Sequence, residues 1–524
     1  MVGTFWAFVP AIVAIILALI TKQVYVSLFV GIFVGAMFYA GGNPLEAMST
    51  LFSVMSEEVG GNATILVFLV VLGIFVILMQ KSGGAKAYGE WAQTKIKSKS
   101  GALGATAALG CLIFVDDYFN CLTVGSVMRP ITDKYKVSHT KLSYIIDATA
   151  APVCIIAPIS SWAAAVSSEA EGLGVNGLVM FIQTIPFNVY ALLTLVMVFV
   201  LCFTKLDFAK MKRNELIATT TGDLDAGETE TSAEDMNVQT NVNGKVRHLI
   251  IPVIVLIVCC VFGMLYTGGI FDGVNFIDAF ANCDAGMSLA IGSVVALVIV
   301  SIYYIIDKVV SFKEITESFT QGFKTMVPAI LILTFAWTLS GIMGPRYSVE
   351  DGASYLGAGK FVYDNVSNIP SFLSSLFPLI FFALACGIAF ATGTSWGTFG
   401  ILVPIAISLL GGTDTLSIIT ISACLGGAVF GDHVSPISDT TILASAGGAC
   451  NHVDHVKTQI PYAGSVAIIG AIGYIVAGFL ANVNGLLAGA IMWVVVAALF
   501  VGFIFLIKYM NKKAEANQLT DIAE

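Results

Sequence analysis

Carboxylates inside apolar segments are the residues of this sequence with the most chemistry to offer. Asp116 and Asp117 interrupt one apolar block, and Asp147, Asp432 and Asp439 lie in or beside others. An intramembrane carboxylate is costly unless it is paired or hydrated, so it indicates a functional site. A buried carboxylate can bind a proton or a cation at the same oxygen. That competition is the minimal chemistry of cation/proton exchange.

Interruptions of the apolar segments accompany these carboxylates. Two fall in each half of the chain, at residues 115–120, 152–162, 391–396 and 431–441. Proline frees a backbone carbonyl, and free carbonyls with hydroxyl and carboxylate oxygens suit a small alkali cation. The breaks therefore predict a cation and proton site with these candidates: Asp116, Asp117, Asn120, Asp147, Ser160, Thr392, Thr394, Ser395, Asp432, His433, Ser435, Ser438, Asp439 and Thr440.

Other interpretations stay open for some of these residues. Asp147 could be a boundary residue that pairs with Lys141 or Arg129 near the cytoplasmic face. His433 could relay protons or could be a histidine whose hydrogen bonds are satisfied at a helix break. The spacing of His452 and His455 resembles that of metal ligands. No second ligand cluster accompanies them, so we interpret their segment as a solvated or membrane-surface loop.

The amino-acid composition indicates what kind of secondary structure holds these candidate residues. Of the 524 residues, 57% are apolar and only 11% are charged, with a mean hydropathy of +0.89. These values exclude a soluble enzyme, a nucleic-acid binder and a disordered chain. An all-α polytopic membrane protein remains, because about 20 apolar residues span the hydrocarbon core.

The apolar segments predict eleven transmembrane helices. Two further blocks, residues 101–130 and 372–410, are broken in the middle, and we expect each to form a re-entrant helical hairpin. The eleven spans are expected at residues 4–20, 24–40, 63–79, 142–165, 187–203, 249–266, 289–306, 326–343, 416–445, 462–480 and 486–507.

Basic residues predict the orientation. With both hairpins re-entrant, 23 of the 25 basic residues lie on one face, which leaves Arg346 and Lys360 outside. The positive-inside rule makes that face cytoplasmic. We therefore expect a multi-pass protein of the cell membrane, with a cytoplasmic C-terminus and the N-terminus outside.

A polar insertion divides the chain into two halves. Residues 205–247 have basic ends and an acidic, Thr-rich middle, which indicates a disordered cytoplasmic linker. It separates a first membrane repeat, 1–204, from a second, 248–510, which a cytoplasmic tail, 511–524, follows. Motifs recur across the linker at spacings of 274 to 278 residues; residues 142–143 and 158–160, for example, match 416–417 and 436–438. The halves begin on opposite faces, as in transporters with inverted repeats.

Four longer motifs resemble the NhaC-type Na⁺/H⁺ antiporter family: residues 115–130, 391–399, 430–443 and 450–462. The resemblance implies a fold with paired re-entrant hairpins and discontinuous helices. It also implies that Na⁺ and H⁺ are the transported ions and that no cofactor is used. The Na⁺ ligands would come from Asp116, Asp117, Asp432 and Asp439. The protein would be a transporter and not an enzyme.

Two functions remain open at this point. The first is Na⁺/H⁺ exchange by alternating access, which the acidic tip at Asp116 and Asp117 favours. The second is exchange or coupled transport of an organic acid or amino acid, since the family includes malate/lactate-type exchangers. The neutral tip at residues 392–395 leaves room for such an anion. A primary pump is disfavoured because the sequence has no phosphate-binding loop. Expected partners are the bilayer, monovalent cations, protons and a small organic anion, with no nucleic acid; a homodimer stays open.

Overall fold

The structure is a computed structural model of the chain. It describes all residues except 1–2, 22, 172, 174, 205, 227–240, 242, 277–278, 280–282, 345–346, 349–351, 354, 358–369, 437, 482 and 524. Predictions that concern these residues, including most of the acidic part of the expected linker, lie outside the described residues.

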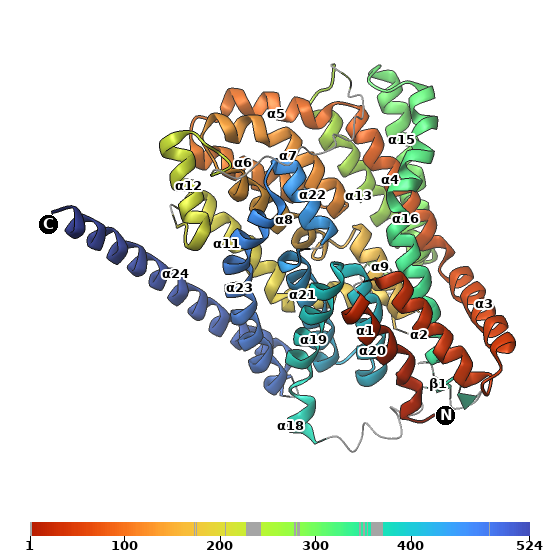
Figure 1. The fold of residues 1–524 in the computed structure, drawn as a ribbon. Helices are drawn as coiled ribbons and strands as arrows, with labels where there is room; N and C mark the ends of the chain where they lie inside the picture. The colour runs from red at the N-terminus through yellow and green to blue at the C-terminus, as the bar shows by residue number, and fades with distance from the viewer. Residues whose placement is uncertain are drawn as a thin grey trace.

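Helices make up nearly all of the described chain (Figure 1). Up to the linker they are η1 Phe5–Phe8, α1 Val9–Thr21, α2 Val24–Tyr39, α3 Pro44–Gly61, α4 Ala63–Lys81, α5 Gly84–Lys95, α6 Lys99–Leu112, α7 Asp117–Lys134, α8 His139–Cys154, α9 Ser161–Glu171, α10 Gly177–Thr184, η2 Ile185–Phe187, α11 Val189–Phe203 and α12 Ala209–Thr221. After it they are α13 Arg247–Thr267, η3 Ile270–Asp272, α15 Ala285–Ile306, α16 Phe312–Met343, α18 Ser371–Ser374, α19 Phe377–Thr392, α20 Ser395–Leu410, α21 Thr415–Val434, α22 Asp439–Gly448, α23 His452–Leu480 and α24 Gly485–Ala523. The described strands are β1 Tyr347–Ser348 and β2 Gly352–Ala353, which form one short antiparallel pair.

The predicted fold class, an all-α membrane protein, is confirmed. Among the described residues, seven helices are long and apolar enough to cross a membrane, or up to ten if each bent pair is one span. Helices suit this environment because they satisfy their backbone polar groups internally. The count of eleven spans stays a prediction. The segment 372–391 is also long enough to cross alone, so its assignment to a re-entrant hairpin stays a prediction too.

Some helices, α3 and α12 among them, form where the sequence predicts no membrane segment. Helix α3 begins at an Asn43 cap, whose side chain accepts hydrogen bonds from the backbone N–H groups of Leu45 and Glu46. It bends 117° away from α2. Helix α12 lies inside the segment 205–247, where we expected disorder. It forms because its buried face, with Met211 and Asn214, packs on α8 and α23. Tertiary contacts thus order a segment of low hydropathy.

The predicted breaks are present and occur in the same order in both halves. Helices α6 and α7 are separated by residues 113–116, and α8 and α9 by residues 155–160. In the second half, residues 393–394 separate α19 from α20, and residues 435–438 separate α21 from α22. The repeat and its inverted orientation both stay predictions.

The two halves of the chain pack against each other next to these helix breaks. Helix α22 of the second half packs against both α7 and α8 of the first. A Cβ atom at Gly447 of α22 would lie 2.6 Å from the carbonyl oxygen of Cys121 on α7. Only a glycine therefore allows this approach, which brings residues of both halves to one place in the core.

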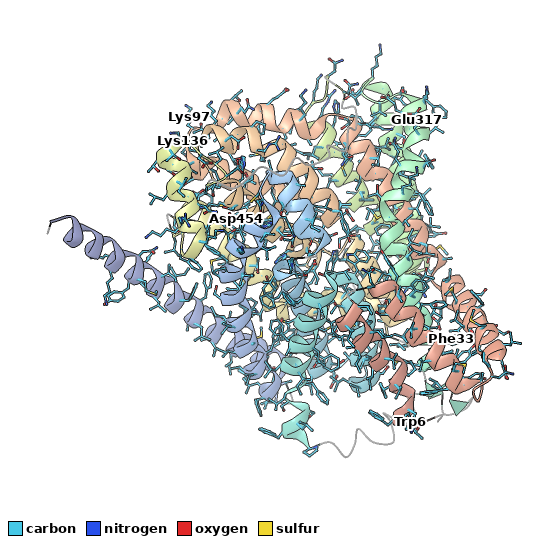
Figure 2. All side chains as sticks on the ribbon, in the orientation of Figure 1. Trp6, Phe33, Lys97, Lys136, Glu317 and Asp454 are labelled. Carbon is cyan, nitrogen blue, oxygen red and sulfur yellow. The ribbon has the colours of Figure 1, made fainter. Side chains whose placement is uncertain are left out.

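Three labelled charged residues lie at the end of the molecule opposite Trp6. Figure 2 shows Lys97, Lys136 and Glu317 at one end and Trp6 near the other. Helix α24 extends away from the rest of the molecule (Figure 1). The orientation of the chain in the membrane stays a prediction.

Candidate functional site

Asp147 lies on α8 at the centre of the molecule and is 0% exposed. Its Oδ2 accepts hydrogen bonds from Gln459 Nε2 at 2.6 Å and from Thr441 Oγ1 at 3.0 Å. Its Oδ1 is buried and has no partner among the described residues. Lys141 does not pair with it, because the Lys141 ammonium binds Asp207 at 2.8 Å. The boundary interpretation of Asp147 is therefore wrong as far as Lys141 is concerned.

Asp432 lies in the last turn of α21, next to the break before α22. Its Oδ2 accepts hydrogen bonds from Ser395 Oγ and Thr440 Oγ1, both at 2.9 Å. Ser395 begins α20, so this carboxylate joins the tip of the second hairpin to the broken helix α21–α22. The hydroxyl of Thr441, the next residue of α22, donates to the Asp147 carboxylate and also lies 3.4 Å from the backbone carbonyl oxygen of Asp432, so it connects Asp147 to the end of α21.

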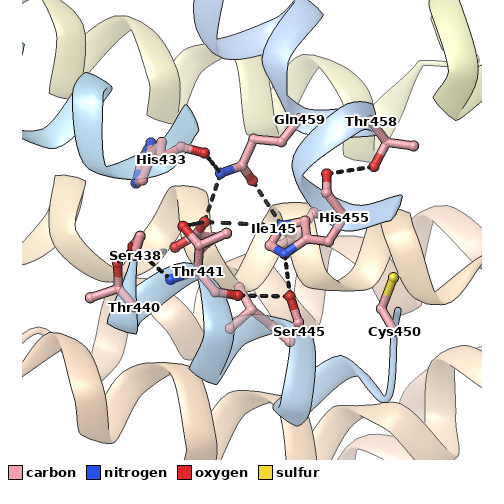
Figure 3. Close-up of polar contacts among 12 residues, drawn as sticks. Ile145, His433, Ser438, Thr440, Thr441, Ser445, Cys450, His455, Thr458 and Gln459 are labelled. Carbon is pink, nitrogen blue, oxygen red and sulfur yellow. Dashed lines mark hydrogen bonds and ion pairs between the residues drawn. The ribbon is translucent and has the colours of Figure 1, made fainter. Parts of the chain in front are cut away.

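Helix α23 supplies His455 and Gln459, which were not among the predicted site residues (Figure 3). Gln459 Nε2 also donates to the His433 carbonyl oxygen at 2.7 Å, and Gln459 Oε1 lies 2.9 Å from His455 Nε2. His455 Nε2 is 4.0 Å from Asp147 Oδ2, and its Nδ1 lies 2.8 Å from Ser445 Oγ. His455 is fully buried, so the interpretation of its segment as a solvated loop is wrong. His455 and Gln459 are four residues apart, and this spacing in the sequence indicates that both side chains lie on the same face of a helix.

His433 precedes the same break. Its Nδ1 lies 2.9 Å from the hydroxyl of Tyr190 on α11. Its Nε2 is buried and has no partner among the described residues. One ring nitrogen is therefore held in place while the other is available to a proton or a ligand, which leaves the relay role open.

Residues at the break between α6 and α7, the predicted tip of the first hairpin, make contacts separate from those of Asp147 and Asp432. Asp117 Oδ2 accepts a hydrogen bond from Trp162 Nε1 at 3.1 Å, and Asp116 and Asp117 are both buried. Asn120 Nδ2 donates to the carbonyl oxygens of Gly110 at 2.7 Å and Ile113 at 2.9 Å. These carbonyls end α6, so Asn120 satisfies backbone groups that the break exposes.

Several predicted site residues have structural contacts. Ser160, Thr394 and Ser438 accept hydrogen bonds from the backbone N–H groups of Ala163, Gly397 and Thr441, at the starts of α9, α20 and α22. An N-cap of this type typically stabilises a helix by about 1 kcal/mol. Ser435 Oγ donates to the Phe390 carbonyl oxygen at 2.7 Å. The side chains of Thr392 and Asp439 lie outside the described residues.

The chemistry of the cluster follows from its donors and acceptors. The carboxylates of Asp147 and Asp432 accept hydrogen bonds from hydroxyls and an amide, and a histidine stands beside the first. Within the described ranges, no three His, Cys, Asp or Glu side chains are arranged to hold one metal ion. A cation here would therefore depend on hydroxyl and carbonyl oxygens beside a carboxylate. Such oxygens suit a hard alkali ion better than a transition metal.

A multi-pass helical membrane protein with buried carboxylates at helix breaks has the architecture of a secondary transporter. A model of the Na⁺/H⁺ antiporter family matches residues 163–479, and the chain belongs to that family. This confirms the predicted family and shows that the protein is a transporter and not an enzyme.

Two relatives and one solved structure extend the comparison. An uncharacterized protein of Haemophilus influenzae is 40% identical over 454 residues, which cover 84% of this chain and 83% of that protein. The malate-2H⁺/Na⁺-lactate antiporter of Bacillus subtilis is 30% identical over 172 residues, 32% of this chain and 34% of that protein. The Alcanivorax borkumensis YdaH transporter has a similar fold, with a TM-score of 0.50 at 11% identity over 82% of this chain and 88% of that chain.

Proposed function

We propose that the protein exchanges Na⁺ for H⁺ across the cytoplasmic membrane by alternating access. The observation that carries the proposal is the environment of Asp147, in which Oδ2 is held by Gln459 and Thr441 while Oδ1 is buried without a partner in the described chain. An ionised carboxylate in such a place needs a counter-charge. Either Na⁺ or H⁺ supplies it, but not both at once.

The exchange then follows from competition at one atom. Na⁺ binds the ionised Asp147 at Oδ1, and a proton that arrives at this oxygen displaces the ion and neutralises the carboxylate. Asp432 is the second carboxylate of the site, and its Oδ2 accepts hydrogen bonds from the hydroxyls of Ser395 and Thr440. His433, whose Nε2 is available, is the group proposed to pass protons. The inward proton gradient drives Na⁺ out.

A second function is transport of a small organic acid in exchange for, or together with, these ions. It is favoured by the neutral start of α20, where Thr394 and Ser395 lie at a helix N-terminus, which attracts anions. The similarity to a malate-2H⁺/Na⁺-lactate antiporter over 172 residues also supports it. In this case Asp432 would hold the cation beside the substrate carboxylate.

Reconstituted vesicles separate the two functions. The purified protein in proteoliposomes with a lumenal pH dye receives pulses of NaCl, LiCl, KCl, malate, lactate and amino acids. Na⁺/H⁺ exchange predicts a pH change with NaCl alone, lost in Asp147→Asn and kept in Asp223→Asn, an exposed aspartate of the linker segment. A response that requires malate or lactate would favour the second function. No response to NaCl in wild type would refute the first.

A further inference from the structure

Glu169 on α9 is a buried carboxylate that the site described above does not use. It is 3% exposed, and neither Oε1 nor Oε2 has a hydrogen-bond partner among the described residues. An ionised glutamate without partners in a membrane protein costs several kcal/mol, so this conformation accommodates the neutral acid. Ionisation then requires water or a cation to reach the side chain.

The position of Glu169 connects it to the first hairpin tip. It lies seven residues after Trp162, which places both on one face of α9 about 10 Å apart along the axis. Trp162 donates to Asp117 and packs against Trp396 and Phe399 of α20, with ring centroids 5.8 and 5.3 Å away. The face of α9 that carries Glu169 is thus the face turned toward α20.

A cleft leads to the same place between α16 and α20. It is small, and it is lined by Ala336, Leu339, Met343, Gly400, Pro404 and Ser408, among others. Gly400 lies beside the carboxyl group, because a Cβ atom there would be 3.8 Å from Glu169 Oε1. Met343 ends α16 and Ser408 is near the end of α20, so the cleft lies toward these helix ends, and its wall at Gly400 is next to Glu169. On the predicted topology, both ends face outside.

The charges around Glu169 come from few neighbours. Helices α10 and α20 carry no titratable side chain, while α15 and α4 carry only Tyr303, Tyr304 and Lys81, in their last turns. Helix α8, which meets α9 at the break, carries the titratable residues His139, Lys141, Tyr144, Asp147 and Cys154. The charged residues of α16 precede residue 325. Glu58 of α3 is the carboxylate whose charge acts on Glu169. Its Oε1 lies 2.5 Å from where a Cβ at Gly341 of α16 would be.

We propose that Glu169 is a second proton-binding site, separate from Asp147 and Asp432, which exchanges protons with the outer side through the cleft between α16 and α20. Hydronium in the cleft gives its proton to a Glu169 oxygen, and water takes the proton back when the group ionises. Because the cleft lining is apolar apart from Ser408, it admits water only when α16 and α20 move apart. Protonation of Glu169 is thereby coupled to the conformation of the second hairpin. This inference rests on the proposed proton exchange.

Two measurements test the site. Infrared spectra of the purified protein at neutral pH should show the carbonyl stretch of a buried carboxylic acid that Glu169→Gln removes. Glu57→Gln, which changes an exposed glutamate of α3, should retain the band. This readout requires no transport, so it stays valid if the proposed exchange fails. An unchanged band in Glu169→Gln would overturn the inference.

The transport measurement uses the same variants in proteoliposomes. Na⁺-driven proton movement by Glu169→Gln should slow by about 100-fold, the low end of what a positioned proton-transfer group contributes. Its Na⁺ affinity by calorimetry should stay within about twofold of wild type, because Asp147 and Asp432 are intact. Glu169→Asp should recover part of the rate. Wild-type exchange in Glu169→Gln would refute the site, whereas absence of exchange in wild type would refute only the proposed function.

Discussion

Gln459→Leu tests the geometry of the carboxylate site most directly. The change removes the Nε2 donor that lies 2.6 Å from Asp147 Oδ2 and keeps a side chain of similar volume. A hydrogen bond to a charged group contributes about 1.5–3 kcal/mol. This bond stabilises the ionised form of Asp147, so its loss favours the protonated form. Since one pH unit corresponds to about 1.36 kcal/mol, protons should displace Na⁺ at a pH about one to two units higher.

The assay is Na⁺ binding by calorimetry at a series of pH values. Wild type should lose Na⁺ affinity as pH falls, and the Gln459→Leu curve should be shifted to higher pH. Gln183→Leu is the matched control, because Gln183 is an exposed glutamine of α10. The reasoning would be refuted by a Gln459→Leu curve that coincides with wild type, or by wild-type binding that does not depend on pH.

The remaining predictions concern three other contacts. Asp432→Asn should weaken Na⁺ binding by about 10- to 150-fold, since charge-assisted contacts contribute about 1.5–3 kcal/mol; unchanged calorimetric affinity would exclude Asp432 as a ligand. Gly447→Leu should lower the thermal midpoint, because overpacking typically costs about 1–3 kcal/mol, and a midpoint equal to wild type would contradict the close α7–α22 contact. Burial raises the pKa of Glu215, but Lys141 and Lys99 outweigh this effect and lower the pKa below its ordinary 4.5. The stabilisation by Glu215 should therefore be constant above about pH 4.5 and be lost as pH falls further; the difference in melting temperature between wild type and Glu215→Gln, followed against pH, measures it.

Local sequence signals predicted the helix breaks well. Proline, glycine and paired aspartates are poorly compatible with an apolar helix, so the interruptions near Asp117, Ser160 and Ser438 could be placed without a structure. Ser395 and Asp432 were named as candidates for the same reason, and the structure joins them by a hydrogen bond.

Contacts between distant segments could not be predicted in this way. Gln459 and His455 lie at a polar start of a helix, and such a stretch reads as a loop when its packing partners are unknown. Helix α12 has a low hydropathy, and the contacts that accompany its order join distant segments: it packs on α8 and α23, and Glu215 pairs with Lys99 at 2.7 Å. Ser160 and Ser438 cap helices, and the sequence alone does not distinguish such a cap from a cation ligand, because both are hydroxyls at a helix break.

The bond between Asp147 and Gln459 has a consequence for biosynthesis. The two residues are 312 positions apart. A ribosome that adds about 5–20 residues per second therefore makes Gln459 about 16 to 60 s after Asp147. During that interval Asp147 on α8 lacks the hydrogen bond from Gln459. The protonated form of Asp147 then has the lower free energy in the bilayer. The last membrane segments thus complete the site, and a nascent chain truncated before α23 should fail to hold α8 in its final position.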